Sequence, residues 1–178
     1  YLIVDYIYLD NNERFLFMNS EIEYVVPVLD IIPEKKIFSI NSEYKLDSLN
    51  SPVKILFWRT QLLSNYNSND LFNYSSYPVD LNSSDLINKV NIVINSSNRE
   101  EIDFVKFYNI LQVYFNEFFS INDGIYMYSF GLDPKVDSSG YCNFNKISDA
   151  YLQISFNKLV SYKNPILLKG YAISLNLF

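Results

Sequence analysis

The amino-acid sequence predicts an all-β domain, a β-sandwich or jelly roll with short helical insertions. Aromatic residues make up 17% of the chain, with 16 Tyr and 14 Phe, and such side chains suit the half-buried surface of a sheet. Short apolar runs alternate with long polar stretches, and helical patterns are brief and isolated. Strands joined by elaborated loops favour a sandwich over alternating strand–helix units. With 178 residues, the chain is long enough for one domain with a substantial core.

The first part of the chain predicts one strand, one helical turn and a connection. The run "YLIVDYIYL", Tyr1–Leu9, is rich in β-branched and aromatic residues and predicts a strand. A turn follows, in which Asn12 is expected to cap a short helix that begins at Glu13. After Pro27 and Pro33 the sequence becomes polar, which indicates an irregular connection.

The middle of the chain predicts a core strand and a long loop. The run "SPVKILFWRTQ" reads as a strand that starts at Pro52, because a missing N–H is tolerated at the first residue of a strand. Trp58 lies in this run, so we expect it to be buried between two sheets. Residues Ser64–Ser84 are dominated by Asn, Ser, Tyr and Asp, a composition that predicts an exposed loop.

The last part of the chain predicts four more strands and one helix. The run "VNIVI", Val90–Ile94, is a short strand. Ser97 and Glu100 have the spacing of a capping box, which predicts a helix running through "EEIDFVKFY". The remaining strands are expected at "IYMYSF", "YLQISF" and "ILLKGYAISLNLF".

Charge and hydropathy exclude two classes of partner. The formal net charge is −6 and the isoelectric point is near 4.6, so the chain lacks the basic footprint of a protein that binds nucleic acid directly. No apolar run approaches the roughly 20 residues of a transmembrane helix.

Cys142 is the single cysteine and predicts no internal disulfide, which favours an intracellular origin. The chain opens without Met inside a strand-like run, and we interpret it as a fragment.

The residue inventory argues against an enzyme and predicts no cofactor. There is no histidine, which removes the commonest general base and the Ser-His-Asp and Cys-His systems. Two carboxylate pairs, Asp133 with Asp137 and Asp80 with Asp85, have the chemistry of an acid/base pair or a calcium site, but we favour solvated loop acids. Cys142 has no histidine or basic pair beside it in sequence, so we interpret it as a packing residue.

The stretch "YSFGLDPKVDSSGYCNFNKISDAYLQISF" resembles the carboxy-terminal jelly roll of the double jelly-roll major capsid proteins of nucleocytoplasmic large DNA viruses. The resemblance lies in the order and spacing of five short motifs. They fall on Tyr128–Phe130, Ser138–Gly140, Cys142–Phe144, Lys146–Ile147 and Ala150–Gln153. Ser138 stands where this family usually has Pro.

Three further blocks resemble the same family and occur in its order. Val4–Arg14 is similar to the end of the first jelly roll and its linker helix, Ser51–Trp58 to the first core strand of the second, and Tyr171–Leu177 to the closing strand. Phe15–Met18, where the family is usually more basic, and Ile22, where it often has His, depart from the pattern.

The resemblance implies three parts of the chain. Residues 1–12 would be the last strand region of a preceding jelly roll. Residues 13–48 would be a linker with a short helix and a polar connection, and residues 49–178 the carboxy-terminal jelly roll. The fold expected is therefore the second half of a double jelly roll.

A structural corner is expected between the motifs. Ser139 and Gly140 would supply a sharp reversal, with Gly140 in a backbone conformation unfavourable to other residues. Phe144 and Ile147 would plug the end of the sandwich, and Asn143 would hydrogen-bond local backbone in an Asx turn.

The resemblance implies a structural virion protein. Its expected partners are two further copies in a trimeric, pseudo-hexagonal capsomer, neighbouring capsomers and minor capsid proteins of an icosahedral shell, with indirect contact to an internal viral membrane. The expected location is the virion capsid, assembled in the host cytoplasm. Two alternatives stay open: a poxvirus-type scaffold protein of the same fold, and a jelly-roll carbohydrate-binding module with a tyrosine platform.

Overall fold

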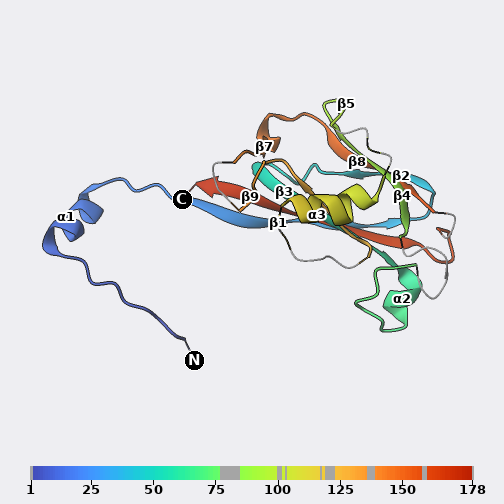
Figure 1. The fold of residues 1–178 in the computed structure, drawn as a ribbon, viewed down its shortest axis with the longest axis horizontal. Helices are drawn as coiled ribbons and strands as arrows, with labels where there is room; N and C mark the ends of the chain where they lie inside the picture. The colour runs from blue at the N-terminus through green and yellow to red at the C-terminus, as the bar shows by residue number, and fades with distance from the viewer. Residues whose placement is uncertain are drawn as a thin grey trace.

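Two antiparallel sheets pack face to face in the computed structural model, and a long amino-terminal arm leads away from them (Figure 1). The structure describes residues 2–76, 85–99, 102, 104–116, 118, 123–135, 139–157 and 160–177. The all-β class predicted from the sequence is confirmed.

The strands and helices follow one another along the chain with the helices inserted between strands. The strands are β1 Val25–Ile37, β2 Asn41–Lys45, β3 Pro52–Leu62, β4 Ile87–Ile94, β5 Ser97–Asn98, β6 Ile125–Ser129, β7 Cys142–Asn143, β8 Ala150–Phe156 and β9 Ile166–Leu177. The helices are α1 Asn11–Asn19, α2 Leu63–Asn67, the π-helical turn η1 Phe107–Leu111, α3 Gln112–Phe115 and the 3₁₀ turn η2 Phe144–Lys146.

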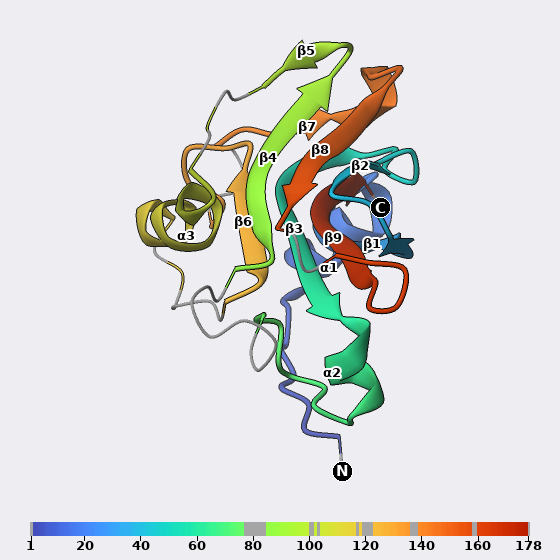
Figure 2. The same ribbon diagram turned by 90° about the vertical axis from the view of Figure 1, so that its right-hand side faces the viewer.

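The strand order is that of a jelly roll. One sheet has the order β1-β9-β3-β6, with the short β7 also paired to β3, and the other has the order β2-β8-β4-β5 (Figure 2). The chain therefore crosses between the sheets repeatedly, and its first and last long strands, β1 and β9, pair antiparallel. This double Greek-key connectivity distinguishes a jelly roll from a simple meander.

Strand β3 lies in the interior of its sheet, as its apolar sequence predicts. It pairs with β9 along one side and with β6 and β7 along the other. Trp58 is 0% exposed, as expected, and its ring lies 5.9 Å from that of Tyr126 in a stacked arrangement and 5.3 Å from that of Tyr108 edge-on. These three aromatic rings form the centre of the core between the sheets.

The predicted linker, residues 13–48, contains two strands of the sandwich, and this corrects the predicted polar connection. Strand β1 is the edge of its sheet, and an edge strand tolerates proline because one of its sides needs no N–H donors. Pro27 lies within β1, and Pro33 falls where the register with β9 shifts, at a bulge. Consequently β3 is the third strand of the jelly roll and not its first.

The amino-terminal predictions also differ from the structure. Residues 2–9 form no strand in the structure. Helix α1 is capped by Asp10 and not by Asn12: the Asp10 carboxylate accepts a hydrogen bond from Glu13 N at 2.8 Å, and the Glu13 carboxylate accepts one from Asp10 N at 3.1 Å. This reciprocal capping box fixes where the helix begins.

The capping box predicted at Ser97 is wrong. Ser97 lies in β5, which follows β4 through a turn in which Asn95 and Ser96 have φ of +48° and +62°. Two consecutive positive φ values are typical of a type I′ hairpin turn, whose twist suits paired strands. Glu100 lies outside the described residues, and the helix begins further along, at Phe107.

The predicted loop Ser64–Ser84 is partly ordered against the sandwich. Its first residues belong to α2, and Asn65 and Ser76 are buried. Gln61 of β3 holds this segment, since its side-chain Nε2 donates to the backbone oxygen of Leu71 at 3.0 Å. Residues 77–84 lie outside the described residues.

Tyr44 connects the two sheets. It extends from β2 to β9, where its hydroxyl accepts a hydrogen bond from Gly170 N at 2.8 Å and donates to Pro33 O at 2.9 Å. Gly170 lies opposite Ile32, next to the register shift in β1. A Cβ on Gly170 would lie 2.8 Å from Ile32 Cδ1 and 3.0 Å from Tyr44 Cε1, so a larger residue would require these two side chains to move.

We expect stability to fall steeply at alkaline pH because of this tyrosine. Burial raises the pKa of Tyr44 to about 12, while the Gly170 hydrogen bond acts in the opposite direction. The folded state therefore favours the neutral phenol, so this contribution is complete below about pH 10, the ordinary pKa of tyrosine, and is lost as the pH rises toward 12. Urea unfolding followed between pH 8 and pH 12 measures the loss.

The variant Tyr44→Phe should make this alkaline decline shallower. At neutral pH it should be about 1–3 kcal/mol less stable than the native protein, because the buried Gly170 N–H loses its acceptor. The matched control is Tyr162→Phe at an exposed loop position, which should change neither quantity. An unchanged alkaline slope in Tyr44→Phe would show that another group governs the decline.

Candidate assembly surfaces

The corner residues predicted from the sequence come together at one end of the sandwich. Gly140 has φ of +127°, a conformation that favours glycine. The Ser139 hydroxyl donates to Asp133 O across the loop. The Asn143 side chain accepts a hydrogen bond from Asn145 N at 3.1 Å, which is the predicted Asx turn.

Two apolar side chains close this end of the core. Phe144 is buried against Phe130, with ring centroids 5.8 Å apart and edge-on, and Ile147 packs partly buried against the same core. The backbone of Phe144 donates to Ser51 O at 3.2 Å, just before β3. Trp58, the other predicted structural residue, lies further along β3 in the middle of the core and does not belong to the corner.

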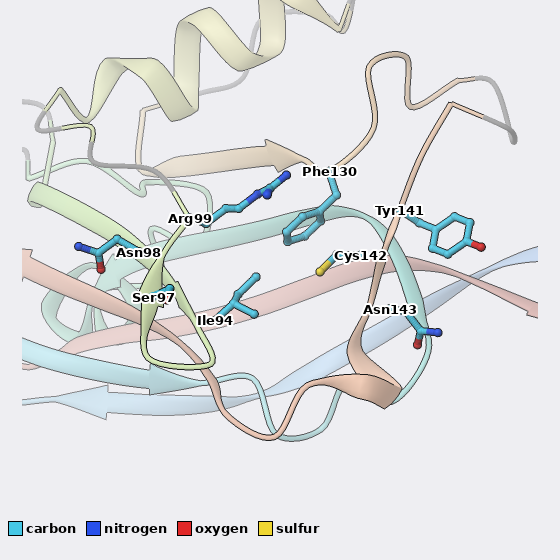
Figure 3. Close-up of a pocket in the computed structure, with 8 residues that line it drawn as sticks. All are labelled: Ile94, Ser97, Asn98, Arg99, Phe130, Tyr141, Cys142 and Asn143. Carbon is cyan, nitrogen blue, oxygen red and sulfur yellow. The ribbon is translucent and has the colours of Figure 1, made fainter.

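An open groove of about 450 Å³ lies beside the corner (Figure 3). The end of β4, the strand β5 and the residue after it form one wall, and the residue after β6 and the segment that leads into and includes β7 form the other. The lining residues are Ile94, Ser97, Asn98, Arg99, Phe130, Tyr141, Cys142 and Asn143. Tyr141 is the one tyrosine among them, so the groove does not provide the tyrosine platform of the carbohydrate-binding alternative.

The groove contains the one cysteine of the chain. Burial raises the pKa of the Cys142 thiol, and the nearby charge of Arg99 acts in the opposite direction. A thiol with a raised pKa is protonated at neutral pH and is a weak nucleophile. Cys142 therefore behaves as the packing residue that the sequence predicts.

The predicted carboxylate pairs have other roles where the structure describes them. Asp133 accepts a hydrogen bond from Lys135 N at 2.9 Å in a local turn. Asp85 is nearly buried, and one of its carboxylate oxygens lies 2.8 Å from Lys106 Nζ. Asp80 and Asp137, their predicted partners, lie outside the described residues. The described part of the chain contains no group of three or more metal-ligating side chains.

The Asp85–Lys106 ion pair attaches the helical insertion to the sandwich. The hydrogen bond to Asp85 raises the pKa of Lys106. Tyr126 donates to the same carboxylate at 3.4 Å, and burial, followed by the Asp85 charge, raises the pKa of Tyr126. Lys106 therefore stays charged and Tyr126 stays neutral at neutral pH.

The outer surfaces of the two sheets differ in polarity. On the four-stranded sheet the outward positions carry polar and charged side chains. They include Glu43, Lys45, Lys89, Asn91, Gln153 and Ser155. Such a surface is compatible with water and does not need to be covered.

The outer surface of the other sheet is apolar along β1 and the adjoining part of β9. Leu29 and Ile31 of β1 lie opposite Ile173 and Tyr171 of β9, so these four side chains share one face. Leu29 is 60% exposed and Ile31 58% exposed. Val25 is also exposed on this side, and we name Val25, Leu29 and Ile31 the β1 patch.

The helical insertion covers the other half of the same sheet. Val113 of α3 is buried against Ile55 of β3 and Met127 of β6, and Phe57 and Phe118 pack at their margin. At the amino-terminal end of the insertion Tyr108 enters the main core and donates to Val90 O at 3.3 Å. The helix therefore closes the side of the sandwich beyond β6 (Figure 2).

A second apolar patch lies on the outward side of this helix. Its members are Ile110, Leu111, Tyr114 and Phe115, which we name the helix patch. Tyr114 is 75% exposed and Phe115 is 64% exposed. Clustered exposed apolar residues of this kind mark interaction surfaces, whereas single ones are ordinary.

Helix α1 and its flanks also expose apolar side chains. Residues 2–24, the arm, lead into β1, and no residue of α1 is buried. The exposed side chains of α1 include Phe15, Leu16, Phe17 and Met18, the stretch where the sequence departs from the family pattern.

Sequence reasoning missed both patches. The segment "FVKFYNILQVYFN", 104–116, has apolar residues around most of the helix, and only contacts reveal which of them face the core. The one available signal is that Lys106 is its single charged residue, which is unusual for a helix with one side in water.

The described helices include none with the length and apolar character that crossing a bilayer requires.

A family model for the large eukaryotic DNA virus major capsid protein matches residues 13–166. Among curated proteins, probable capsid protein 4 of Acanthamoeba polyphaga mimivirus is 28% identical over 186 residues, which cover 99% of this chain and 36% of that protein. Capsid protein 1 of the same virus is 38% identical over 74 residues, or 41% of this chain and 12% of that protein.

Two solved structures share the fold. The crystal structure of PBCV-1 VP54, fitted into a reconstruction of the virophage Sputnik, has a TM-score of 0.75 and 20% identity and covers 97% of this chain and 52% of that chain. The Faustovirus major capsid protein has a TM-score of 0.81 and 10% identity and covers 96% of this chain and 36% of that chain. This chain thus spans between about a third and a half of these longer relatives.

Proposed function

Because this chain belongs to the large eukaryotic DNA virus major capsid protein family, we propose that it forms one jelly-roll lobe of a structural protein of the virion shell. The observation that carries the proposal is the family match over 13–166, which includes strands of both sheets. A structural role needs neither a catalytic site nor a cofactor. It needs a rigid lobe with surfaces that other lobes can cover.

The complete subunit has two such lobes in this proposal. The relatives are two to three times as long as this chain, which leaves room for a preceding jelly roll of similar size. Val4–Arg14 resembles the end of that first lobe and its linker, and the arm that contains it projects from the sandwich (Figure 1). The assignment of residues 1–12 to a preceding lobe belongs to this proposal.

Three subunits form a homotrimer with six lobes, the pseudo-hexagonal capsomer. The exposed apolar patches support this assembly, because they are surfaces that a neighbour would bury. Obligate interfaces of this kind typically bury roughly 2,000 Å² or more. Capsomers would then contact one another and minor capsid proteins in an icosahedral shell.

The proposed location is the virion capsid, after assembly in the host cytoplasm. Contact with an internal viral membrane would be indirect. The net charge of −6 argues against direct packing on viral DNA, because the chain repels phosphates overall. A transient scaffold of the same fold differs from a capsid protein in one observable respect, namely that it is absent from the mature particle.

We expect the full-length chain to be a homotrimer in solution at micromolar concentration. The measurement is light scattering coupled to size-exclusion chromatography, with the 178-residue chain as comparison. That shorter chain should be monomeric or should aggregate, since it lacks the lobe that completes the ring and exposes unpaired apolar segments. A monodisperse full-length monomer would contradict the capsomer. Purified mature particles that lack the protein would instead favour the scaffold role.

A further inference from the structure

A polar hollow lies on the outer surface of the four-stranded sheet, away from both apolar patches. Its volume is about 450 Å³, and strands β2, β8 and β4 all contribute to it. The lining residues, which we call the polar hollow, are Asn41, Lys89, Asn91, Gln153, Ile154 and Ser155. In Figure 2, β8 and β4 are drawn in front of β3 and β9, and no helix lies over them. The described helices therefore leave this face open to a ligand.

The register of the strands arranges the polar side chains in rows. Two rows run across β4, β8 and β2, namely Asn91–Gln153–Glu43 and Lys89–Ser155–Asn41. Neighbouring strands lie about 4.8 Å apart, and alternate residues lie about 7 Å apart along a strand. Hydrogen-bonding groups at these spacings present a grid to a flat ligand that carries several polar groups of its own.

Neutral side chains that both donate and accept hydrogen bonds dominate the hollow. Among the described residues, the side chains of Asn91, Gln153 and Ser155 make no hydrogen bond with any protein group. Asn91 Oδ1 is also buried, and a buried acceptor without a partner is unfavourable. A ligand hydroxyl that donated to this oxygen would remove the penalty. The long side chains of Lys89 and Gln153 line the same hollow and can move to admit it.

Tyr151 adds an aromatic ring beside the hollow. It precedes Gln153 by two residues on β8, so it lies on the same outer face, opposite Lys45 and Val93. The residue is partly exposed. The apolar face of such a ring packs against the C–H groups of a sugar, while amide groups bind the sugar hydroxyls. An aromatic ring beside a row of amides is therefore suited to carbohydrate recognition.

We propose that the polar hollow, together with Tyr151, binds an uncharged oligosaccharide. Lys89 is the one charged residue among the described lining residues, and Glu43 in the adjoining row carries the opposite charge. The face therefore has no strong preference for an anion. A stable protein partner would need apolar contacts, and Ile154, the one apolar lining residue, is 1% exposed. The inference does not depend on the capsomer, because a single lobe carries the whole site.

An array of neutral oligosaccharides, built from hexoses and N-acetylhexosamines, tests the proposal with the full-length protein. We expect saturable binding to a small number of them. Isothermal titration calorimetry then gives the dissociation constant for the strongest. That constant should change little when salt is added, because salt screens interactions between charges and the ligand carries none.

Substitution tests whether the polar hollow is the binding site. The double variant Asn91→Ala with Gln153→Ala should bind the same oligosaccharide about tenfold more weakly or worse, because hydrogen bonds at two positions are lost. Gln153→Glu keeps the shape of the side chain but removes its N–H donors, and it should also weaken binding. Asn145→Ala, an exposed amide at the corner, is the matched control and should bind as the native protein does. Circular dichroism should show the same strand content in all three variants.

Three results would overturn the inference. The first is the absence of saturable binding to any oligosaccharide on the array. The second is equal binding by the native protein and the double variant, and the third is binding restricted to acidic glycans that added salt abolishes. Each of these results leaves the capsid proposal unchanged, since assembly is measured separately by light scattering.

Discussion

Replacement of Trp58 by alanine is expected to destabilise the domain by about 3–5 kcal/mol, the range for truncating a large buried aromatic residue. The side chain is fully buried between the sheets and packs on Tyr126 and Tyr108. Alanine would leave a cavity next to both rings, and two sheets held on either side of a sandwich core cannot move together enough to fill it. The free energy of unfolding, measured by urea titration, tests the prediction.

The variant Trp58→Phe is the matched comparison. Trp58 Nε1 is buried without a hydrogen-bond partner, so phenylalanine keeps an aromatic ring and loses no hydrogen bond. It should therefore cost much less than alanine, about 1–2 kcal/mol for the reduced volume. Trp58 is the only tryptophan, so its emission in the native protein should be that of a buried indole. Equal losses for the two variants, or a solvated indole, would contradict the core position.

The sequence predicts correctly those strands that consist mainly of buried apolar residues. β3, β8 and β9 carry apolar residues at most inward positions, and their runs are recognisable without any neighbour. β2, Asn41–Lys45, buries only Tyr44 and is otherwise polar, so its sequence resembles a loop. β1 contains two prolines, which signal a break unless the strand is known to lie at an edge.

The corner depends on local sequence, whereas the assembly surfaces depend on the tertiary arrangement. Gly140, with its positive φ, and Asn143, with its hydrogen bond to Asn145 N, act through local backbone geometry, which a short motif encodes. The β1 patch and the helix patch depend on which side of an element is left uncovered. That property comes from the tertiary arrangement, because Val113 and Tyr114 are adjacent in sequence yet one is buried and the other exposed. A linear pattern does not separate them.

Replacement of Gly124 by alanine is expected to destabilise the domain about as much as replacement of Trp58 by alanine. Gly124, in the turn before β6, has φ of +80°, and a Cβ placed on it would lie 2.0 Å from the backbone oxygen of Tyr74. Gly124→Ala should destabilise the domain by about 2–6 kcal/mol, from about 1–3 kcal/mol of backbone strain and about 1–3 kcal/mol for displacing a packed segment. Urea unfolding measures the total.

Gly140→Ala isolates the backbone contribution. Gly140 also has a positive φ, but its added Cβ would meet Gly131 Cα at 3.4 Å and the Phe130 backbone oxygen at 3.7 Å. Because both contacts are ordinary, the variant should cost about 1–3 kcal/mol, the strain alone. The backbone of Tyr74 cannot retreat without disturbing the turn at Gly124, whose oxygen accepts a hydrogen bond from Thr60 N of β3 at 2.9 Å. Displacement at Gly124 thus reaches the central strand, whereas displacement at Gly140 stays within the loop. If the two alanine variants unfold at the same urea concentration, segment 70–76 does not pack on the turn as the structure has it.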